Sequence, residues 1–534
     1  MMQTLFECFF GKNIRQETGR YLRELADAQA VASRKKAEEL LRKLNASNGP
    51  NIVVGTTPWG QQVAVPLAEI VKAFAIIGGA TGSGKSSVGL LLIEAILRAL
   101  IEQNGIKYGI GVLDAKGDLF RGVLFLITEL ERTNPRAAEQ LRKRIAMLDF
   151  GLPDPVTSYN FSACWPGTDP DVFAAKRADL IMDLLPGPDK LSLGASGVLK
   201  KIILLHSASN EPITKIADVV EDEQFRTKLV ARCRNPLLTA YFTRQFPHVP
   251  KATLGAILRR TDALFACEGV RLALGGDSAP DFRRLQDDGK IVLINCCGKG
   301  IPRSVRRFLQ ALVYLDLTSA IFDRQCPDVD FLWLCDEAQT FFATEQLREA
   351  TSEVACTART WHTHFIWFTQ NFSTAVQDPR ILKILHTNVG WSLSLRGDPA
   401  DNAFLKAALP VTGRRLRPQE HPFTERSFYS EAEERAIVFE EIACLPKRSA
   451  YFWLKNRAAA ALRIETAHIS IPEGKQLERA ICAIRSDPSV GMRLSRKEYD
   501  RLVEKRDAEW AEGPGDLGAR LKQAYQETRG QAQM

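Results

Sequence analysis

Continuous apolar runs alternate with amphipathic stretches over most of the central chain. The clearest runs are residues 73–77 (AFAII), 108–114 (YGIGVLD), 290–296 (KIVLINC), 331–336 (FLWLCD) and 365–370 (FIWFTQ). Strands that are buried on both faces have this continuous apolar character, and helices between them indicate parallel pairing. The pattern predicts an α/β fold: a mostly parallel sheet with helices on both faces.

This alternation stops in one central segment and at both ends of the chain. Residues 169–281 are helical by pattern and predict an inserted all-α domain. Residues 1–50 and 473–534 are highly charged and predict helix; the second is either a solvated tail or an arm that docks on a partner. The remaining residues, 51–168 and 282–472, form the predicted sheet domain.

Composition sets only broad limits. The chain has 534 residues, 45% apolar and 25% charged, which is typical of two or three globular domains. Its formal net charge of +8 favours an acidic partner only weakly. None of the 11 cysteines forms a Cys-x-x-Cys pair and no signal peptide is visible, which indicates reduced thiols and a cytoplasmic location. We expect no membrane-spanning segment, because no uninterrupted run of about 18 apolar residues is present.

A glycine-rich loop follows the first apolar run. Residues 79–86 read GATGSGKS, which matches the P-loop pattern G-x-x-x-x-G-K-[ST]. Glycines allow backbone N–H groups to converge on phosphate oxygens; Lys85 would bind the β- and γ-phosphates of ATP, and the Ser86 hydroxyl would bind Mg²⁺. The apolar helix that follows would direct its N-terminus at the phosphates. The predicted nucleotide-binding residues are Gly79, Ala80, Thr81, Gly82, Ser83, Gly84, Lys85, Ser86 and Ser87.

Two adjacent carboxylates follow the apolar run that ends at Cys335. The carboxyl ends of parallel strands form the edge where ligands bind. Asp336 is therefore predicted to hold Mg²⁺, and Glu337 to polarise the water that attacks ATP. A charged helix cap is the alternative. An adjacent Asp-Glu pair is typical of motor ATPases, whereas GTPase switches orient the water with a Gln.

Two further residues have the chemistry of a hydrolytic site. Gln370 ends the run at 365–370 and is either a sensor of the γ-phosphate or a turn residue. Arg359, eleven residues earlier, is either a surface residue or the cation that nucleotide motors recruit from outside the loop, often from a neighbouring subunit. Arg396, at the end of the strand-like GWSLSLR, is the rival candidate.

Residues 224–261 form a basic stretch. They contain eight Lys or Arg and no Asp or Glu, with Tyr241, Phe242 and Phe246 among them. Such a surface suits phosphate contacts and base stacking. The alternatives are a solvated helix face, or arginines that pair with acids elsewhere. The candidate DNA-binding residues are Arg232, Arg234, Arg244, Lys251, Arg259 and Arg260.

The motifs, taken in order, resemble one family. GATGSGKS, DAKGDL (114–119), LCDEAQTF and the ART…FTQN pair resemble the TraG/TraD-like coupling proteins of type IV secretion and conjugation, within the HerA–FtsK superfamily. The similarity covers roughly residues 52–471 and implies a RecA-like ATPase domain with an inserted all-α domain, assembled as a homo-hexameric ring around a DNA channel. It also implies that Gln370 senses the γ-phosphate, that Arg359 acts on the ATP of the next subunit, and that residues 169–281 read the substrate.

The resemblance implies an ATP-dependent DNA translocase with ATP and Mg²⁺ as cofactors. Its implied partners are single- or double-stranded DNA, a relaxase and the components of a type IV secretion channel. Such coupling proteins usually begin with membrane-spanning helices, which this sequence lacks, so a separate membrane partner would hold the chain at the inner membrane. Two other functions stay open: a HerA- or FtsK-like translocase for repair, segregation or defence, and a nucleotide-gated adaptor that recruits a relaxase or effector protein.

Overall fold

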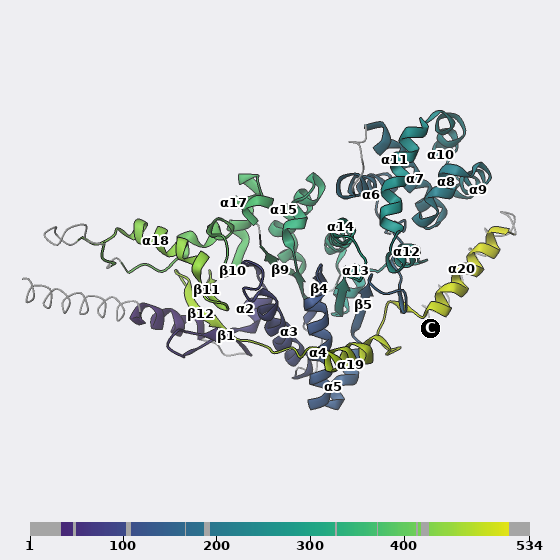
Figure 1. Ribbon diagram of the computed structural model, residues 1–534. Coiled ribbons are helices and arrows are strands. Elements are labelled where there is room, and N and C mark those ends of the chain that lie inside the picture. Colours follow the sequence, from purple (N-terminus) through teal and green to yellow (C-terminus); the bar gives the residue numbers. More distant parts are fainter. Residues whose placement is uncertain are drawn as a thin grey trace, which may run out of the picture. The chain divides into compact units, whose positions relative to one another are not determined.

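The computed structural model describes most of the chain, and Figure 1 shows the order of its elements. The chain divides into two compact units. The first unit comprises the residues up to Ala99 together with Glu337–Gln339 and His364–Ser470, and the second comprises the rest. The described residues are 34–45, 50–102, 108–165, 167–185, 193–325, 328–370, 372–412, 415–417 and 427–511.

The first unit contains the strand that leads into the glycine-rich loop. This strand, β3 (Phe74–Gly78), runs parallel to β10 (Val389–Leu395) on one side and to β9 (Thr363–Thr369) on the other. All three strands are almost wholly buried, which accounts for their continuous apolar sequences. Beyond β10 the pairing becomes antiparallel. The order continues through β11 (Ser449–Leu454), β12 (Leu462–Thr466), β1 (Asn51–Thr56) and β2 (Gln62–Pro66).

Two helices of the first unit begin at recognisable sequence signals, a glycine-rich loop and a capping box. The longest, α3, begins at Lys85 directly after the glycine-rich loop. Helix α18 begins with a capping box, in which Ser430 and Glu433 each bind the other's backbone N–H. The helical elements are residues 34–45, α2 (Leu67–Val71), α3 (Lys85–Glu102), α16 (Phe372–Ala375), α17 (Pro379–Asn388), η7 (Pro399–Ala408), α18 (Glu431–Glu440) and η8 (Glu441–Cys444). The rest of the predicted N-terminal charged helix lies outside the described residues.

The second unit contains four parallel strands. Their order is β8 (Asp330–Cys335), β4 (Tyr108–Asp114), β7 (Ile291–Asn295) and β5 (Ile145–Asp149). Every residue of the four strands is buried. Gly111 of β4 has no space for a side chain, because a Cβ there would lie 2.2 Å from the Trp333 ring on β8. Together with β3, β9 and β10, these strands confirm the predicted α/β fold with a mostly parallel sheet.

Helices that connect these strands bury long apolar faces. In α14, twelve of seventeen residues are buried, because this helix also packs against α6 and α15. The connecting elements are α4 (Asp118–Thr133), α5 (Pro135–Arg142), α13 (Phe282–Asp287), α14 (Arg303–Ser319), η4 (Ala320–Asp323), η5 (Ala338–Phe342), α15 (Glu345–Thr357) and η6 (Ala358–Trp361).

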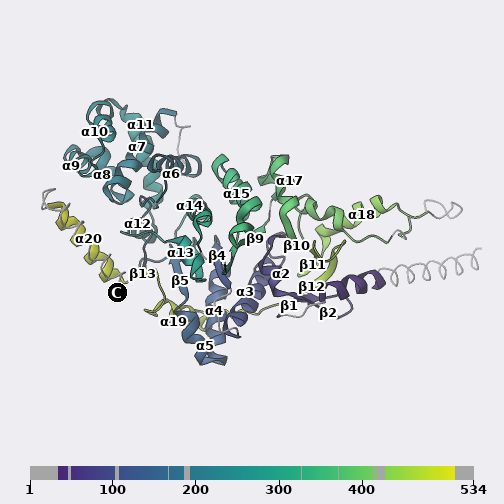
Figure 2. The same cartoon turned by 180° about the vertical axis from the view of Figure 1, so that it is seen from behind.

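Every regular element that the structure describes from Pro170 to Leu274 is a helix, and Figures 1 and 2 show these helices grouped together. A buried ion pair at 2.7 Å joins Arg177 of α6 to Asp316 of α14. The helices belong to the same compact unit as the four parallel strands, so the domain boundaries at 169 and 281 stay a prediction. The elements are α6 (Pro170–Leu184), α7 (Leu193–Ser209), η1 (Ile213–Lys215), α8 (Ile216–Glu221), α9 (Glu223–Cys233), α10 (Pro236–Ala240), η2 (Tyr241–Gln245), η3 (Phe246–His248), α11 (Lys251–Phe265) and α12 (Glu268–Leu274).

The C-terminal segment folds back onto the second unit. Helix α19 (Lys475–Arg485) packs its apolar residues against α4, and Arg485 pairs with the buried Asp149 at 2.5 Å. Strand β13 (Arg493–Leu494) pairs with β6 (Val156–Thr157), and α20 (Arg496–Ala511) follows. The prediction of a solvated tail is wrong for α19 and β13, because one face of α19 is buried and β13 pairs with β6. Residues 512–534 lie outside the described part of the chain.

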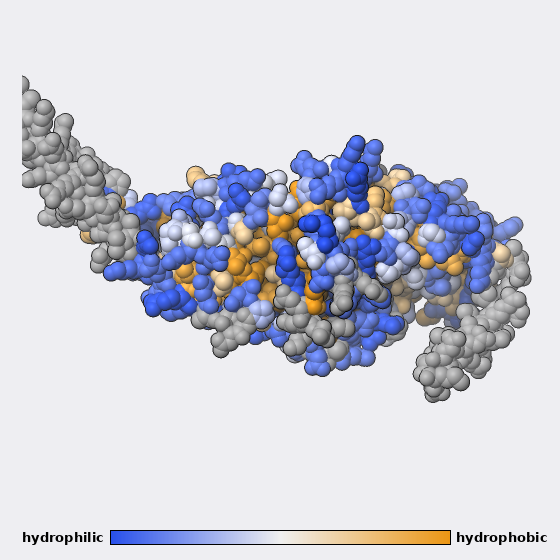
Figure 3. Space-filling view, turned by 90° about the horizontal axis from the view of Figure 1, so that it is seen from below, coloured by the Kyte–Doolittle hydropathy of each residue, from blue (hydrophilic) through white to orange (hydrophobic). Residues whose placement is uncertain are grey.

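Among the described helices, none has both the length and the apolar character that a membrane crossing needs. The face drawn in Figure 3 is largely hydrophilic, with smaller hydrophobic areas between the polar ones. The large apolar side chains that the described part of the chain exposes come from separate elements: Val53, Val172, Leu237, Trp361, Phe428 and Leu502.

Removal of apolar volume from α19 tests whether this helix belongs to the folded second unit. Ile481 is 1% exposed, so Ile481→Ala should lower the free energy of unfolding by about 2 to 5 kcal/mol through lost burial and a cavity. Urea denaturation measures this difference. Cys482 is exposed on the same helix, and Cys482→Ala should change stability by less than about 0.5 kcal/mol. Equal effects of the two substitutions would mean that α19 is solvated.

Candidate functional site

The glycine-rich loop connects β3 to α3 in the first unit. Gly82 (φ +75°) and Gly84 (φ +120°) both adopt backbone conformations that residues with a Cβ rarely reach. Gly79 is constrained by packing, since a Cβ there would lie 2.7 Å from the Ser83 hydroxyl and 2.8 Å from Leu395. These glycines let the chain close tightly over the first turn of α3, which is the geometry of a phosphate-binding loop.

Lys85 is folded into this loop. Its side chain is buried, and its ammonium donates to the carbonyl oxygens of Gly79 at 2.5 Å and Ala80 at 3.0 Å. The buried Ser83 hydroxyl has no hydrogen-bond partner in the structure. A phosphate group in the loop would offer acceptors to both groups. Ser86 is exposed at the start of α3, and the Ser87 hydroxyl lies 3.0 Å from Nδ1 of His468.

Glu337 stands at the centre of a chain of hydrogen bonds. One oxygen of its carboxylate accepts from the Gln370 amide, and the other accepts from the Gln339 amide. The Gln370 oxygen in turn accepts from the hydroxyl of Thr81, in the glycine-rich loop, at 2.5 Å. All four residues belong to the first unit. We call this chain, Thr81–Gln370–Glu337–Gln339, the glutamate relay.

The backbone of Glu337 is unusual in the same place. Its φ of +49° lies in the left-handed region, which costs a residue with a side chain about 1 to 3 kcal/mol. The turn directs the Glu337 side chain to Gln370 and Gln339 at the point where β8 ends. Local strain of this kind is typical of sites where side-chain direction matters more than stability.

Asp336 directly precedes Glu337 and belongs to the second unit. Its backbone N–H donates to the Leu113 carbonyl at 3.0 Å, and its own carbonyl accepts from the Gln310 amide. The described residues contain no cluster of three or more His, Cys, Asp or Glu with metal-binding geometry. A Mg²⁺ site made of one serine hydroxyl, one aspartate, phosphate oxygens and water needs no such cluster. Ser86 and Asp336 therefore have the right chemistry for the predicted ion.

The aspartate of the DAKGDL motif shapes a turn. Asp114 is fully buried at the end of β4 and accepts hydrogen bonds from the backbone N–H groups of Lys116, Gly117 and Phe120 at 2.8 to 2.9 Å. Burial raises the pKa of this carboxyl, while the three backbone donors oppose that rise. Asp114 thus fixes the path from β4 into α4.

The two candidate arginines lie in different places. Arg359 is exposed on η6, before β9 begins, whereas Gln370 follows the end of the same strand. The two residues therefore flank β9 at its opposite ends. The carbonyl of Arg396 accepts from the N–H of Ala80 at 2.7 Å, so the rival candidate lies beside the glycine-rich loop of its own chain.

Sequence reasoning missed a cation beside the loop. Arg448 has a left-handed backbone (φ +70°), and its N–H donates to the Ser83 carbonyl at 3.1 Å. Its exposed side chain passes close to Gly84, where a Cβ would lie 3.4 Å from Cγ of Arg448. The only signal in the sequence is a basic pair, Lys447–Arg448, just before an apolar run. Gln339 was missed as well, although it lies within the DEAQ motif.

The basic stretch divides into buried and exposed members. Arg260 is 4% exposed and donates to the Ala256 carbonyl at 3.4 Å. Arg226 donates to the Val219 carbonyl at 2.9 Å and stacks over the Phe246 ring. The prediction of Arg260 as a DNA contact is therefore wrong. Arg232 is partly exposed, and the exposed members are Lys228, Arg234, Arg244, Lys251 and Arg259.

The aromatic residues of this stretch form a small core. Phe242 and Phe246 are buried with ring centroids 5.1 Å apart, and Tyr241 packs edge-on against Phe242. Rings that are buried in this way cannot stack on bases. The expectation of base stacking by Phe242 and Phe246 is wrong, and what this surface offers to a phosphate backbone is positive charge.

Comparison with known proteins gives a likeness of fold. No family model and no curated protein matches the sequence. The plasmid coupling protein TrwB in complex with the ATP analogue ADPNP matches with a TM-score of 0.51 and 16% identity, over 81% of this chain and 93% of that one. TrwB with ADP and Mg²⁺ matches with a TM-score of 0.50 and 15% identity, over 82% and 94%. VirB4 of Thermoanaerobacter pseudethanolicus gives 0.48 and 14%, over 79% and 98%.

The TrwB structures confirm the expected fold. The chain has the α/β fold of a conjugative coupling protein over most of its length. The resemblance inferred from the motifs is thus confirmed at the level of fold. The geometry of the glycine-rich loop and of the glutamate relay adds what the fold alone does not give: the placement of individual side chains.

Nucleotide affinity tests the loop directly. Lys85→Ala removes the ammonium that would bind phosphate oxygens, a charged hydrogen-bond donor of the kind that contributes about 1.5 to 3 kcal/mol. Titration calorimetry with Mg²⁺-ATP should show binding that is about 10- to 150-fold weaker. Lys383, exposed on α17 of the same unit, gives the matched control Lys383→Ala, which should bind as the wild type does. Equal affinity of the two variants would contradict the phosphate-binding assignment.

Proposed function

We propose that this chain is an ATP-hydrolysing motor, a coupling protein that pumps DNA with its bound relaxase into a type IV secretion or conjugation channel. The observation that carries the ATPase part is the glutamate relay, which links the phosphate-binding loop to a strand-end carboxylate through one glutamine. The fold likeness to TrwB, whose structures contain ADP, Mg²⁺ and ADPNP, supports a nucleotide-dependent function.

In the proposed reaction, Lys85 exchanges the Gly79 and Ala80 carbonyls for the β- and γ-phosphates of ATP. Ser86 and Asp336 would hold Mg²⁺, which would neutralise charge on the phosphate oxygens when bound. Glu337 orients a water molecule for in-line attack on the γ-phosphate. The products are ADP and inorganic phosphate.

The glutamate relay gives this reaction a control point. Both carboxylate oxygens of Glu337 accept an amide hydrogen bond, so the two amides fix the direction of the carboxylate and compete with water for its lone pairs. Gln370 is the partner that also contacts the loop through Thr81. A γ-phosphate that takes the Gln370 amide as its own donor therefore releases one Glu337 oxygen. Nucleotide binding and activation of water are coupled in this way.

A homo-hexameric ring completes the proposed site. Arg359 is exposed at the end of β9 opposite to Gln370, so we assign it to the ATP of a neighbouring copy. An arginine supplied to the γ-phosphate in this manner raises hydrolysis by about 10³- to 10⁵-fold. In this proposal the ring lies at the cytoplasmic side of the inner membrane, held there by a separate membrane partner.

Glu337→Gln tests the catalytic assignment. The amide keeps the size of the side chain but cannot accept a proton, so steady-state ATP turnover should fall by at least about 100-fold while Mg²⁺-ATP affinity stays within about threefold. Phosphate release and titration calorimetry measure the two quantities. Glu345, exposed at the start of α15, provides the control Glu345→Gln, which should retain wild-type turnover. Turnover of Glu337→Gln near the wild-type rate would exclude Glu337 as the base.

DNA dependence separates the motor from its alternatives. ATP turnover that rises on addition of single- or double-stranded DNA is expected of a translocase, whereas a nucleotide-gated adaptor would show no stimulation. Copurification of the chain with secretion-channel components or a relaxase is expected of a coupling protein. Copurification with a nuclease in their place would favour a HerA-like translocase.

The exposed arginines of the basic stretch should contribute to DNA affinity. Removing Arg244 and Arg259 together should flatten the plot of log K against log salt by up to about 1.8 for duplex DNA, since each lost phosphate contact reduces the slope by about 0.9. Fluorescence anisotropy at several salt concentrations measures the slope. The double variant Arg132→Ala/Arg284→Ala removes two exposed arginines from other helices and should leave the slope unchanged. Equal slopes for the wild type and both double variants would mean that DNA does not contact Arg244 and Arg259.

A further inference from the structure

The turn that carries Arg359 lies at the surface and is held by several hydrogen bonds. Arg359 is exposed and Trp361 is 37% exposed, yet the turn is closed by a hydrogen bond from the His362 N–H to the Arg359 carbonyl at 3.1 Å. His362 adopts a left-handed backbone (φ +52°), and its imidazole lies 3.3 Å from the Asp330 carboxylate. We call residues 359–362 the arginine turn.

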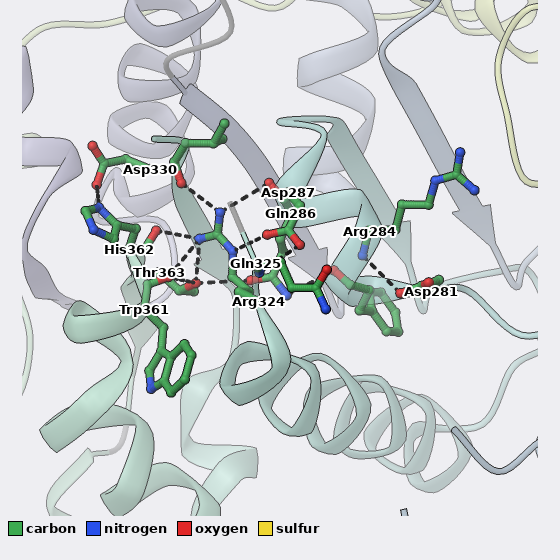
Figure 4. A network of polar contacts seen from close by, with 12 residues as sticks. Asp281, Arg284, Gln286, Asp287, Arg324, Gln325, Asp330, Trp361, His362 and Thr363 are labelled. Carbon is green, nitrogen blue, oxygen red and sulfur yellow. Dashed lines mark hydrogen bonds and ion pairs between the residues drawn. The ribbon is translucent and has the colours of Figure 1, made fainter. Parts of the chain in front are cut away.

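A buried arginine, Arg324, binds the carbonyl groups at the end of this turn (Figure 4). The Arg324 side chain is 2% exposed, and one guanidinium nitrogen donates to the carbonyls of Trp361 at 2.9 Å and His362 at 2.8 Å. The same nitrogen reaches the Thr363 hydroxyl at 3.1 Å, where β9 starts. Arg324 therefore binds the end of the turn and the first residue of the strand together.

The remaining donors of Arg324 connect the turn to the core of the second unit. Nε donates to the carboxylate of Asp287 at 3.1 Å, and Nη2 donates to the Val329 carbonyl at 2.7 Å. Gln286, next to Asp287, accepts from the Thr363 hydroxyl at 3.2 Å. A buried guanidinium costs several kcal/mol unless it is paired and hydrogen-bonded. Here that cost is offset by contacts that converge on one surface turn.

We infer that Arg324 is a positioning residue, which holds the arginine turn so that Arg359 is presented to the ATP of a second copy of this chain. The inference rests on the proposed function of Arg359. A cation that acts across a subunit boundary cannot be positioned by the phosphate-binding loop it serves, so its own subunit has to fix its backbone. A misplacement of about 1 Å at a reacting centre can cost on the order of 100-fold in rate.

Lysine cannot replace Arg324 in this role. A guanidinium presents five donors in a planar fork, whereas an ammonium has three donors on a flexible stem. Arg324→Lys keeps the buried positive charge, but three donors cannot bind the Asp287 carboxylate and the carbonyls of Trp361, His362 and Val329 simultaneously. The substitution should loosen the turn while the charge balance of the core is preserved.

A double-mutant cycle in the full chain tests this inference. Arg359→Ala should lower single-turnover ATP hydrolysis by about 10³-fold or more. Arg324→Lys should lower kcat by about 10- to 100-fold, with KM for ATP within about twofold of the wild type. In the Arg359→Ala background, Arg324→Lys should have no further effect, because the group it positions is absent.

Arg144 supplies a matched control in the same unit. It donates to the carbonyls of Tyr108 and Gly289 and is remote in sequence from the arginine turn. Arg144→Lys should reduce kcat by less than about twofold in either background. A second variant, Asp287→Asn, weakens the anchor of Arg324 without changing the arginine. It should lower kcat by about threefold or more, and this effect too should vanish in the Arg359→Ala background.

The outcomes distinguish the inference from the function on which it rests. If Arg324→Lys and Asp287→Asn reduce kcat equally in both backgrounds, or reduce it only when light scattering shows loss of assembly, Arg324 has a merely structural role and the inference is wrong. Unchanged turnover in Arg359→Ala would remove the arginine itself from the mechanism. Wild-type hydrolysis by Lys85→Ala would overturn the ATPase proposal as a whole.

Discussion

The carboxylate of Glu337, bound between two amides, is the interaction on which the rest of the site depends. The Gln370 amide, just after β9, donates to this carboxylate, and the Gln370 oxygen accepts from Thr81 in the phosphate-binding loop. The Gln339 amide, in the first turn after β8, donates to the other oxygen of the carboxylate. A carboxylate that accepts an amide hydrogen bond on each oxygen is held in one direction. The same hydrogen bonds thus preorganise the arrangement of Thr81, Gln370, Glu337 and Gln339.

Elements whose signal lies within one segment could be predicted from sequence. Residues 73–77 and 108–114 are buried on both faces, so their runs are continuously apolar, and the strands begin and end within a residue or so of the prediction. Strand β12 (LRIET) alternates buried and exposed positions over five residues, a strand signal that is present in the sequence and that the prediction did not use. The glycine-rich loop and the Asp336–Glu337 pair were visible because their chemistry is contiguous in the chain.

What could not be predicted depends on contacts between distant segments. Arg448 is 364 residues beyond Gly84 in the sequence, and only the fold brings the two together. Arg259 and Arg260 are neighbours with the same charge, yet one is exposed and the other buried, because residues 256, 257, 260, 261 and 264 form the buried face of α11. This second case is different from the first, because helical periodicity within the sequence separates the two arginines, and a count of charges over the whole stretch does not.

The C-terminal segment also completes a sheet edge. Strand β5 is the last of the four parallel strands, and its outer side would present unpaired backbone groups to any other chain. Gly491 binds the N–H of Met147 and the carbonyl of Ile145 at 3.1 and 3.0 Å, so this edge is covered from within the same chain. A cut in the segment before Gly491 would therefore have a consequence beyond lost packing. It would leave the outer edge of β5 bare, and such an edge is a template for aggregation.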